Sequence, residues 1–336
     1  MEMPTSRPGR KPNMSCARRL AIVITPSERL TMTASGAVSI RSPGSSSRDS
    51  TPVPSPTKLP KFRNSGHGFI VPGHRPGVTI DPDRPSSARV YDAFLGGTHN
   101  FAVDRSVASR VMELVPEVAG VARANRAFLH RVVHWAITNG VRQFIDLGSG
   151  IPTEGNVHEV ALAADPGARV AYVDVDPTAV LYARDLLGDD PRTAVVESDL
   201  RDPAAVLGDP ELLAVINLGQ PVAILMIAVL HFVPDGPVLD ATLRGYREAV
   251  APGSLLALSH ATGGLHPEAV NRVADLYNRS GTPFVPRDER QVSALFQGWE
   301  LIPPGVVPAP AWHPDGASER ISDPAASLIL TGAGRR

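Results

Sequence analysis

The most restrictive feature of the sequence is a short apolar run that ends in an acid and two glycines one residue apart, QFIDLGSGIP at residues 143–152. This pattern predicts a buried strand that turns tightly into a helix. Gly148 permits backbone angles that other residues avoid, and Gly150 has no side chain to hold a ligand away from the main chain. The helix start adds unpaired N–H groups, so the turn predicts a small-molecule site.

Two details indicate which molecule binds there. A dinucleotide fingerprint needs a third glycine three residues after the second, and position 153 is a threonine. Asp146 would repel a pyrophosphate, but it suits the cationic amino group at the methionine end of S-adenosylmethionine (SAM). We therefore predict that Asp146, Gly148, Ser149 and Gly150 contact SAM, with a dinucleotide-dependent dehydrogenase and a plain structural turn as the alternatives.

Composition limits the other functions. At 336 residues, with 43% hydrophobic and 20% charged, the chain can bury the core of one large domain with extensions. Residues 1–63 hold eleven basic and three acidic side chains, a charge of +8 that leaves −9 for the rest. An acidic body argues against a nucleic-acid surface. All lysines lie within residues 1–61, so the body offers no Schiff-base lysine and no P-loop Gly-Lys-Ser/Thr motif, which argues against pyridoxal and P-loop nucleotide chemistry.

Cysteine usage and hydropathy indicate a location. Cys16 is the only cysteine, which excludes an intrachain disulfide and a thiolate metal cluster and fits a reducing compartment. The longest strongly apolar run, Val222 to Leu230, is far shorter than the roughly 20 residues of a membrane-spanning helix. We expect a soluble, cytoplasmic protein without a bound metal.

Three segments differ in pattern. Residues 1–75 are rich in Ser, Pro, Arg and Gly and are expected to form a disordered leader. Residues 84–140 predict three helices, at 86–95, from about 105 to 115 and at 118–138, which would form an N-terminal cap. From residue 141 strands and helices alternate, so residues 141–336 are predicted to be the binding domain, an α/β fold around a mostly parallel sheet.

The expected elements of this domain follow from apolar runs and their boundaries. Strands are predicted at 143–147, 169–173, 193–196, 222–230 and 255–259, and helices near 155–164, 178–187, 203–217, 237–250, 267–279 and 288–297. Two further strands, near 299–302 and 326–330, would add a hairpin with an antiparallel strand to the sheet. Such an addition is typical of a methyltransferase sheet and is lacking in a simple dinucleotide fold.

Acids follow the second predicted strand. Asp174 lies 24 residues after Gly150, where a carboxylate can accept hydrogen bonds from both ribose hydroxyls. Asp176 precedes a proline and is the better candidate for a helix cap. Val175 lies between them and is predicted to contact the cofactor as well. The alternative is that both acids are caps.

Two more candidates follow the third and fourth predicted strands. Asp199 could accept from the adenine amino group, with Leu200 beside it, although a capping or solvated acid is the alternative. His231 lies at the edge where ligands bind in parallel sheets and is the candidate general base for an acceptor. The competing interpretation of His231 is a packed histidine at a strand end.

Seven short motifs together resemble a known family. They are ARVYDAFLGG (88–97), NFAVDR (100–105), DLGSGIPT (146–153), NVHEV (156–160), YVD (172–174), LHFVPD (230–235) and PGVV (304–307). Over roughly residues 84–336 the chain resembles the actinobacterial SAM-dependent methyltransferases once catalogued only as a domain of unknown function.

The resemblance implies a class I, Rossmann-like methyltransferase with an added N-terminal helical part. SAM would be the cofactor, and its methyl group would pass to an unidentified acceptor, expected to be a small molecule. Arg89, Tyr91, Asn100 and Asp104 would then contact the cofactor or the acceptor from a lid, or serve as helix caps and interhelical hydrogen bonds. A SAM-binding regulatory protein without turnover is the alternative function.

Overall fold

The computed structural model describes residues 29–32, 38–41, 63–64, 69–70, 79–152, 155–264, 266–314 and 328–336. The chain divides into two compact units, Met1–Pro60 and Lys61–Arg336. In the first, β1 (Arg29–Met32) pairs antiparallel with β2 (Val38–Arg41). In the second, β3 (Arg63–Asn64), β4 (Phe69–Ile70) and β5 (Thr79–Ile80) form a small antiparallel sheet. The other residues of the predicted leader lie outside the described residues, so its expected disorder stays a prediction.

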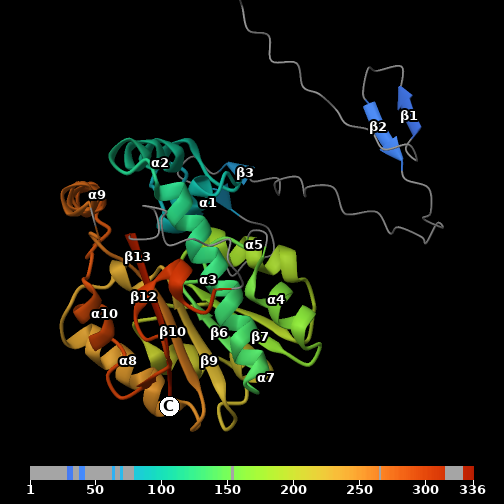
Figure 1. Ribbon diagram of the computed structural model, residues 1–336, viewed down its shortest axis with the longest axis vertical. Coiled ribbons are helices and arrows are strands. Elements are labelled where there is room, and N and C mark those ends of the chain that lie inside the picture. The colour runs from blue at the N-terminus through green and yellow to red at the C-terminus, as the bar shows by residue number, and fades with distance from the viewer. Residues whose placement is uncertain are drawn as a thin grey trace, which may run out of the picture. The chain divides into compact units, whose positions relative to one another are not determined.

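The second unit is built on a sheet of eight described strands (Figure 1). Its parallel part consists of β6 (Gln143–Leu147), β7 (Arg169–Asp174), β8 (Thr193–Glu197), β9 (Val222–Ile227) and β10 (Leu255–Ala261). The antiparallel part consists of β11 (Glu300–Leu301), β12 (Val307–Pro308) and β13 (Ile329–Arg335). The order is β11-β13-β10-β9-β6-β7-β8, with β12 also paired to β13. The predicted fold class is confirmed, and the order reverses between β6 and β9, where such sheets bind ligands.

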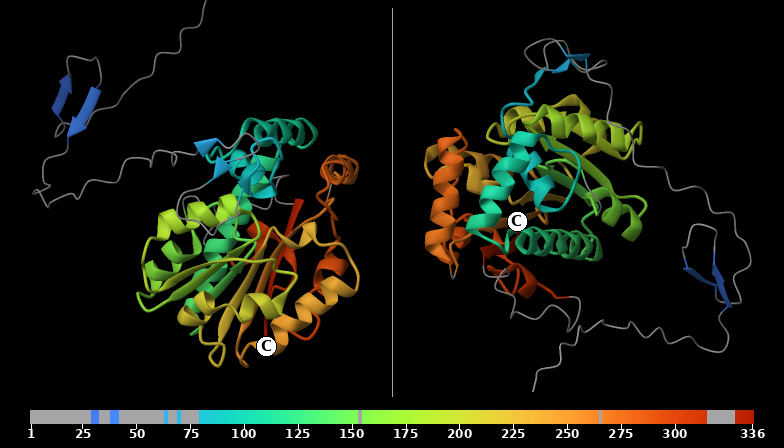
Figure 2. Two further views of the ribbon diagram at one scale, coloured as in Figure 1. Left: turned by 180° about the vertical axis from the view of Figure 1, so that it is seen from behind. Right: turned by 90° about the horizontal axis from the view of Figure 1, so that it is seen from above.

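Helices cover both faces of the sheet, as Figure 2 shows. The described helices are α1 (Ser87–Phe94), α2 (Ala102–Leu114), α3 (Val118–Thr138), α4 (Val157–Ala164), α5 (Pro177–Leu187), α6 (Pro203–Leu207), α7 (Pro210–Val215), α8 (Pro237–Ala249), α9 (Pro267–Arg279) and α10 (Glu289–Ala294). Side chains alternate along each strand, so in β7 Val170 and Tyr172 belong to the apolar cluster that includes residues of α3 and α4, whereas Ala171 and Val173 belong to the cluster that includes residues of α6, α7, α8 and α10. Both faces are therefore buried.

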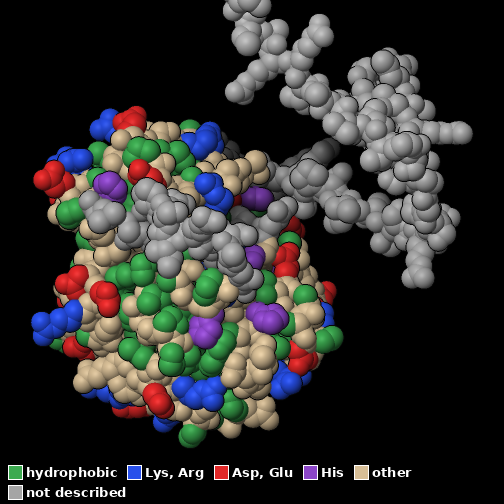
Figure 3. Space-filling view, in the orientation of Figure 1, with side chains coloured by type: hydrophobic (Ala, Val, Ile, Leu, Met, Phe, Trp, Pro, Cys, Tyr) green, Lys and Arg blue, Asp and Glu red, His purple; other side chains and the backbone are tan. Residues whose placement is uncertain are grey.

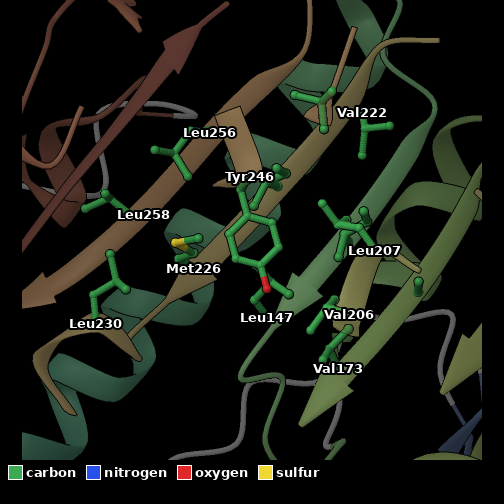
Figure 4. Close-up of a cluster of buried hydrophobic side chains, with 14 of the residues drawn as sticks. Leu147, Val173, Val206, Leu207, Val222, Met226, Leu230, Tyr246, Leu256 and Leu258 are labelled. Carbon is green, nitrogen blue, oxygen red and sulfur yellow. The ribbon is translucent and has the colours of Figure 1, made fainter. Parts of the chain in front are cut away.

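Tyr246 of α8 links this core to the ligand-binding edge (Figure 4). Its ring is 1% exposed and lies among Leu147, Met226 and Leu207. Its hydroxyl donates to the Leu200 carbonyl oxygen at 3.0 Å. Because this hydroxyl is buried, the bond stabilises the loop after β8 that carries two of the predicted cofactor contacts.

The helices of the predicted cap pack with a later helix, α9, that the sequence did not assign to the cap. Val90 of α1, Val111 of α2, and Val273 and Tyr277 of α9 are buried in one apolar cluster. These three helices lie at the same end of the sheet in Figure 1. The end of the sheet is thus covered from both the N-terminal and the C-terminal parts of the unit.

Two predicted elements are shorter than expected. The fourth strand was predicted to reach residue 230 but ends at Ile227, because Ala228 adopts a φ of +53° and a 3₁₀ turn, Leu230–Phe232, follows. The helix predicted at 203–217 is two helices, because Asp209 accepts from the Glu211 N–H and begins α7 with Pro210 in its first turn.

The last strand was predicted too early, at 326–330, whereas β13 spans Ile329–Arg335. Its sequence, ILTGAGR, contains two glycines, which are uncommon in strands. Packing explains them: a Cβ on Gly334 would lie 2.8 Å from the Trp299 Cβ, and one on Gly332 would lie 3.2 Å from the Phe296 ring. Close approach of the Phe296 and Trp299 side chains, not strand propensity, requires the glycines.

Candidate functional site

A cavity of about 750 Å³ opens at the carboxyl ends of β6, β7 and β9, beneath α1. This volume lies within the range of about 300–1,000 Å³ that is usual for small-molecule sites. Its described lining includes eleven of the predicted site residues: Arg89, Tyr91, Asp146, Gly148, Ser149, Gly150, Asp174, Val175, Asp199, Leu200 and His231. Asn100 and Asp104 are not among the described lining residues.

The glycine turn has the conformation that its sequence predicts. Gly148 and Gly150 adopt φ angles of +69° and +65°. The Gly148 N–H donates to the Val173 carbonyl oxygen at 2.8 Å. A Cβ on Gly148 would lie 2.3 Å from Val229 Cγ2, whereas the nearest atom to a Cβ on Gly150 is Ala88 Cβ at 4.0 Å. Gly148 thus allows close packing behind the turn, and Gly150 leaves open space in front of it.

Asp174 connects β7 to this turn. Its Oδ2 accepts from the Gly150 N–H at 2.7 Å and its Oδ1 from the Asp176 N–H at 2.8 Å. Asp174 is 8% exposed, and burial raises its pKa to about 6, although these N–H donors act in the opposite direction. Each carboxylate oxygen has a further lone pair, so Asp174 can accept hydroxyl groups from a ligand in the cavity.

Asp146 is the second buried carboxyl group at the turn. Only 6% of it is exposed, and burial raises its pKa to about 7; Arg126 opposes this shift and Asp174 adds to it. No described residue forms a hydrogen bond with its side chain. A carboxyl group in this setting ionises readily once a cation is placed next to it. The donor set therefore fits a ligand with a positively charged amino group.

The far side of the turn is partly apolar. Val175 is 65% exposed and Leu200 is half-buried, and both line the cavity. Asp199 accepts from Arg201 Nε at 2.9 Å and from Arg201 Nη2 at 2.5 Å. This ion pair lowers the pKa of Asp199, so the carboxylate is charged and already held by a neighbour.

Buried side-chain hydrogen bonds connect helix α1, which lines the cavity, to helices α2 and α5. Arg89 Nε donates to Asp104 Oδ2 at 2.8 Å, and Arg89 Nη1 donates to Thr178 Oγ1 at 3.1 Å. Asn100 Nδ2 donates to Asp92 Oδ2 at 2.7 Å. Asp104 and Asn100 are thus engaged in interhelical and loop hydrogen bonds, which supports the structural alternative for these two residues. A ligand contact by them stays a prediction.

A hydrogen-bonded chain that sequence reasoning missed joins the cap to the sheet. Asn125 Nδ2 donates to the Tyr91 hydroxyl at 2.9 Å, and Asn125 Oδ1 accepts from Ser259 Oγ at 2.5 Å. Ser259 Oγ accepts in turn from the Ala228 N–H at 2.8 Å. Ser259 is fully buried and Asn125 is 1% exposed. A lone Asn in a helix and a lone Ser in a strand gave no signal, because their pairing depends on the tertiary fold.

His231 lies in the 3₁₀ turn after β9, and it lines the cavity. It is 6% exposed, and its Nδ1 has no hydrogen-bond partner among the described residues. Burial, His260 and Arg287 lower its pKa well below the usual value, so the ring is neutral. Arg287 was also missed: it donates to His260 Nε2 at 2.7 Å and to the Leu230 carbonyl oxygen at 3.0 Å, which holds the turn in place.

Two classes of feature are absent from the described part of the chain. No group of three or more His, Cys, Asp or Glu side chains there is arranged to bind a metal ion. None of the helices described is long and apolar enough to cross a membrane.

Comparison with known proteins assigns the chain to a family. Residues 74–336 match the model of a family described as S-adenosyl methyltransferase. A candidate methyltransferase from Thermobifida fusca is 37% identical, with a TM-score of 0.72 over 76% of this chain and 96% of its own. A DUF574 family protein from Streptomyces avermitilis is 36% identical, with a TM-score of 0.72 over 76% of this chain and 98% of its own. No curated protein matches the chain.

These matches confirm the resemblance that the motifs indicated, and the dehydrogenase alternative is not supported. The cavity residues are compatible with the cofactor of this family: open space faces Gly150, the Asp174 carboxylate has lone pairs that hydroxyl groups could use, and the buried Asp146 carboxyl group could pair with a cation. Nothing in the comparisons favours a protein without turnover. The chain therefore belongs to the S-adenosyl methyltransferase family, and it is a SAM-dependent methyltransferase with the class I fold.

Proposed function

We propose that the cavity residues divide the cofactor among three elements. Asp146 and the turn Gly148-Ser149-Gly150 would hold the methionine end, and Asp174 would hold the ribose hydroxyls. Val175 and Leu200 would flank the adenine ring, with Asp199 near its amino group. The observation that supports this assignment is that Asp174 and Asp146, both buried and of raised pKa, lie on either side of one open glycine turn.

The cap, residues 84–140, would close this cavity over the sheet domain, residues 141–336. Arg89 and Tyr91 reach the cavity from α1, and both are fixed by buried partners, so they would form a rigid roof. Ser86 Oγ hydrogen-bonds to Asp176 Oδ2, and the Arg89 guanidinium lies 3.8 Å from the same carboxylate. These contacts hold the start of the cap against the loop after β7.

The acceptor would be a small molecule. The cavity is enclosed by α1, α9 and the ends of the strands, and such a site suits a compact ligand. On the face shown in Figure 3, the basic side chains of the described residues are scattered among acidic ones, which does not suit a nucleic acid. The single cysteine, Cys16, is consistent with a cytoplasmic protein.

His231 would act as the general base. The bound cofactor supplies an electrophilic methyl group on a positively charged sulfur. The protein aligns the acceptor atom behind that methyl group and excludes water, and positioning of this kind contributes roughly 7–11 kcal/mol to catalysis. The neutral His231 ring accepts the proton that the acceptor loses. No side chain has to form a covalent intermediate.

The test has two parts. Calorimetric titration of the whole chain with S-adenosylhomocysteine should show one site, which Asp174→Ala weakens. Incubation with methyl-labelled SAM and a small-molecule extract should move the label to an extract component, and His231→Ala should slow this transfer without loss of cofactor binding. Cofactor binding with no label transfer to any fraction would instead support a regulatory protein without turnover.

A further inference from the structure

The lining of the cavity is divided by charge. Every charged side chain of the described lining lies between Asp81 and Arg201. From Ile227 to Ile329 the described lining contains no Asp, Glu, Lys or Arg. The cofactor contacts proposed above all belong to the charged part. The uncharged part of the lining, from Ile227 to Ile329, is therefore left for the acceptor, and it offers no ion pair to a charged acceptor.

The uncharged part contains three aromatic rings from separate segments. Phe232 comes from the 3₁₀ turn after β9, Tyr277 from α9, and Phe284 from the loop after α9. Tyr277 and Phe284 are stacked, with centroids 5.3 Å apart and planes 21° apart. The ring centroid of Phe232 lies 5.7 Å from the ring centroids of Tyr277 and Phe284. We call these three residues and His231 the aromatic pocket.

His231 is the polar member of this pocket. Its ring centroid is 4.4 Å from that of Phe232 and 4.9 Å from that of Phe284. A backbone hydrogen bond joins the turn that carries His231 to the loop that carries Phe284, because the Val285 N–H donates to the His231 carbonyl oxygen at 2.8 Å. A neutral imidazole carries one acceptor nitrogen, so His231 can accept one hydrogen bond from a ligand that lies in the cavity against these rings.

We propose that the acceptor is an uncharged aromatic compound with a hydroxyl group, bound in the aromatic pocket and methylated on that oxygen; this rests on the methyl transfer proposed above. The hydroxyl oxygen forms a bond to the methyl carbon while the carbon–sulfur bond breaks and its electron pair stays on sulfur. The hydroxyl proton passes to the His231 ring and then to water. S-adenosylhomocysteine and an aryl methyl ether are the products.

Three acceptor classes fit less well. A carboxylate finds no cation in the aromatic pocket, and an aliphatic ammonium finds no acid. An aliphatic alcohol gives up its proton less readily than a phenol, whose pKa is about 10. Burial, together with His260 and Arg287, disfavours the charged form of His231 and lowers its pKa, so a more acidic hydroxyl group suits this base better. Aromatic rings that line a cavity also favour contact with a flat ring over a puckered one.

The test uses the whole chain saturated with S-adenosylhomocysteine. Calorimetric titration compares 2-naphthol with decahydro-2-naphthol and 2-naphthoate, and a parallel assay follows label from methyl-labelled SAM. We expect 2-naphthol to bind, its saturated analogue to bind about ten-fold more weakly, and the carboxylate to bind least. Label should appear on the naphthol oxygen.

Two variants locate the binding. Phe284→Leu should weaken 2-naphthol about ten-fold while S-adenosylhomocysteine affinity stays unchanged, which also shows that the variant is folded. His231→Ala should reduce label transfer more than it reduces 2-naphthol affinity. Normal cofactor binding with no binding of 2-naphthol, or with equal binding of the saturated analogue, would overturn this inference alone. Loss of cofactor binding by the wild-type chain would overturn the proposed cofactor site instead.

Discussion

Asp174 holds the glycine turn through a hydrogen bond: its Oδ2 accepts from the Gly150 N–H at 2.7 Å. The carboxylate that is predicted to bind the ribose therefore also shapes the turn that is predicted to bind the methionine end. Any change at this position is expected to act on both.

Asp174→Ala should weaken SAM binding by about 1–3 kcal/mol, because the ribose hydroxyls and the Gly150 N–H lose a buried acceptor. Calorimetric titration with S-adenosylhomocysteine measures the effect. Asp165→Ala is a suitable control, since this half-buried acid pairs with Arg142 and neither residue is in the described lining of the cavity. Equal affinity of the wild-type chain and Asp174→Ala would remove this residue from the cofactor site.

Asp146 predicts a dependence of stability on pH. Its pKa is raised from 3.8 to about 7 in the folded chain, so between these values the folded state binds more protons than the unfolded state. The free energy of unfolding of the ligand-free protein should therefore fall as pH rises from 5 to 7, by up to about 2 kcal/mol from this group.

Urea unfolding at several pH values measures this effect, and Asp146→Asn should show a smaller slope. Bound SAM should oppose this fall in stability, because its amino group favours the ionised form of Asp146. The affinity for SAM is therefore expected to rise with pH through about 7, and binding below that pH should release protons. Identical slopes for the variant and the wild type would mean that Asp146 is ionised in the ligand-free protein.

The two glycines of the turn predict different outcomes for the same substitution. Alanine at either position is strained, because both φ angles are positive, at a cost of about 1–2 kcal/mol. Gly148→Ala adds a clash with Val229 and should cost about 1–3 kcal/mol more than Gly150→Ala in unfolding free energy. Combining Gly148→Ala with Val229→Ala should recover part of the difference, and no recovery would locate the strain in the backbone alone.

The buried chain from Tyr91 to Ala228 predicts that the cap and the sheet are coupled. Asn125→Ala removes the acceptor of the Ser259 hydroxyl proton and the donor to the Tyr91 hydroxyl, and it should lower the free energy of unfolding by about 1–3 kcal/mol. Chemical denaturation measures it. Asn139→Ala is the matched control, since that exposed Asn at the end of α3 bonds only to a backbone oxygen of its own helix among the described contacts. A similar loss in both variants would contradict the coupling.

Three of the parallel strands, β6, β7 and β8, were predictable because each contains an apolar run that is closed by an acid or a glycine, as at Asp174 and Gly148. The errors arose where tertiary packing overrides local preference. Residues 332 and 334 of β13 are glycines because Phe296 and Trp299 leave no room for a Cβ, so their low strand propensity misplaced the predicted strand. The site residues on strand ends were likewise accessible to pattern analysis, whereas the aromatic pocket was not, since its rings come from segments whose proximity depends on how α9 folds back.

Asp199 is a predicted cofactor contact whose role can be tested by breaking its ion pair with Arg201 separately from its carboxylate. Its carboxylate already pairs with Arg201, and both side chains are partly exposed. An exposed pair of this kind contributes only about 0–1 kcal/mol to stability, so Asp199→Asn should leave the unfolding midpoint nearly unchanged.

If Asp199 also accepts from the adenine amino group, the same variant should weaken the binding of S-adenosylhomocysteine by about 1 kcal/mol, with a smaller effect on a ligand that lacks the amino group, such as S-inosylhomocysteine. Arg201→Gln, which breaks the pair but keeps the acid, is the matched control. Equal losses of affinity in both variants would show that Asp199 acts by ordering the loop after β8, and not by direct contact with adenine.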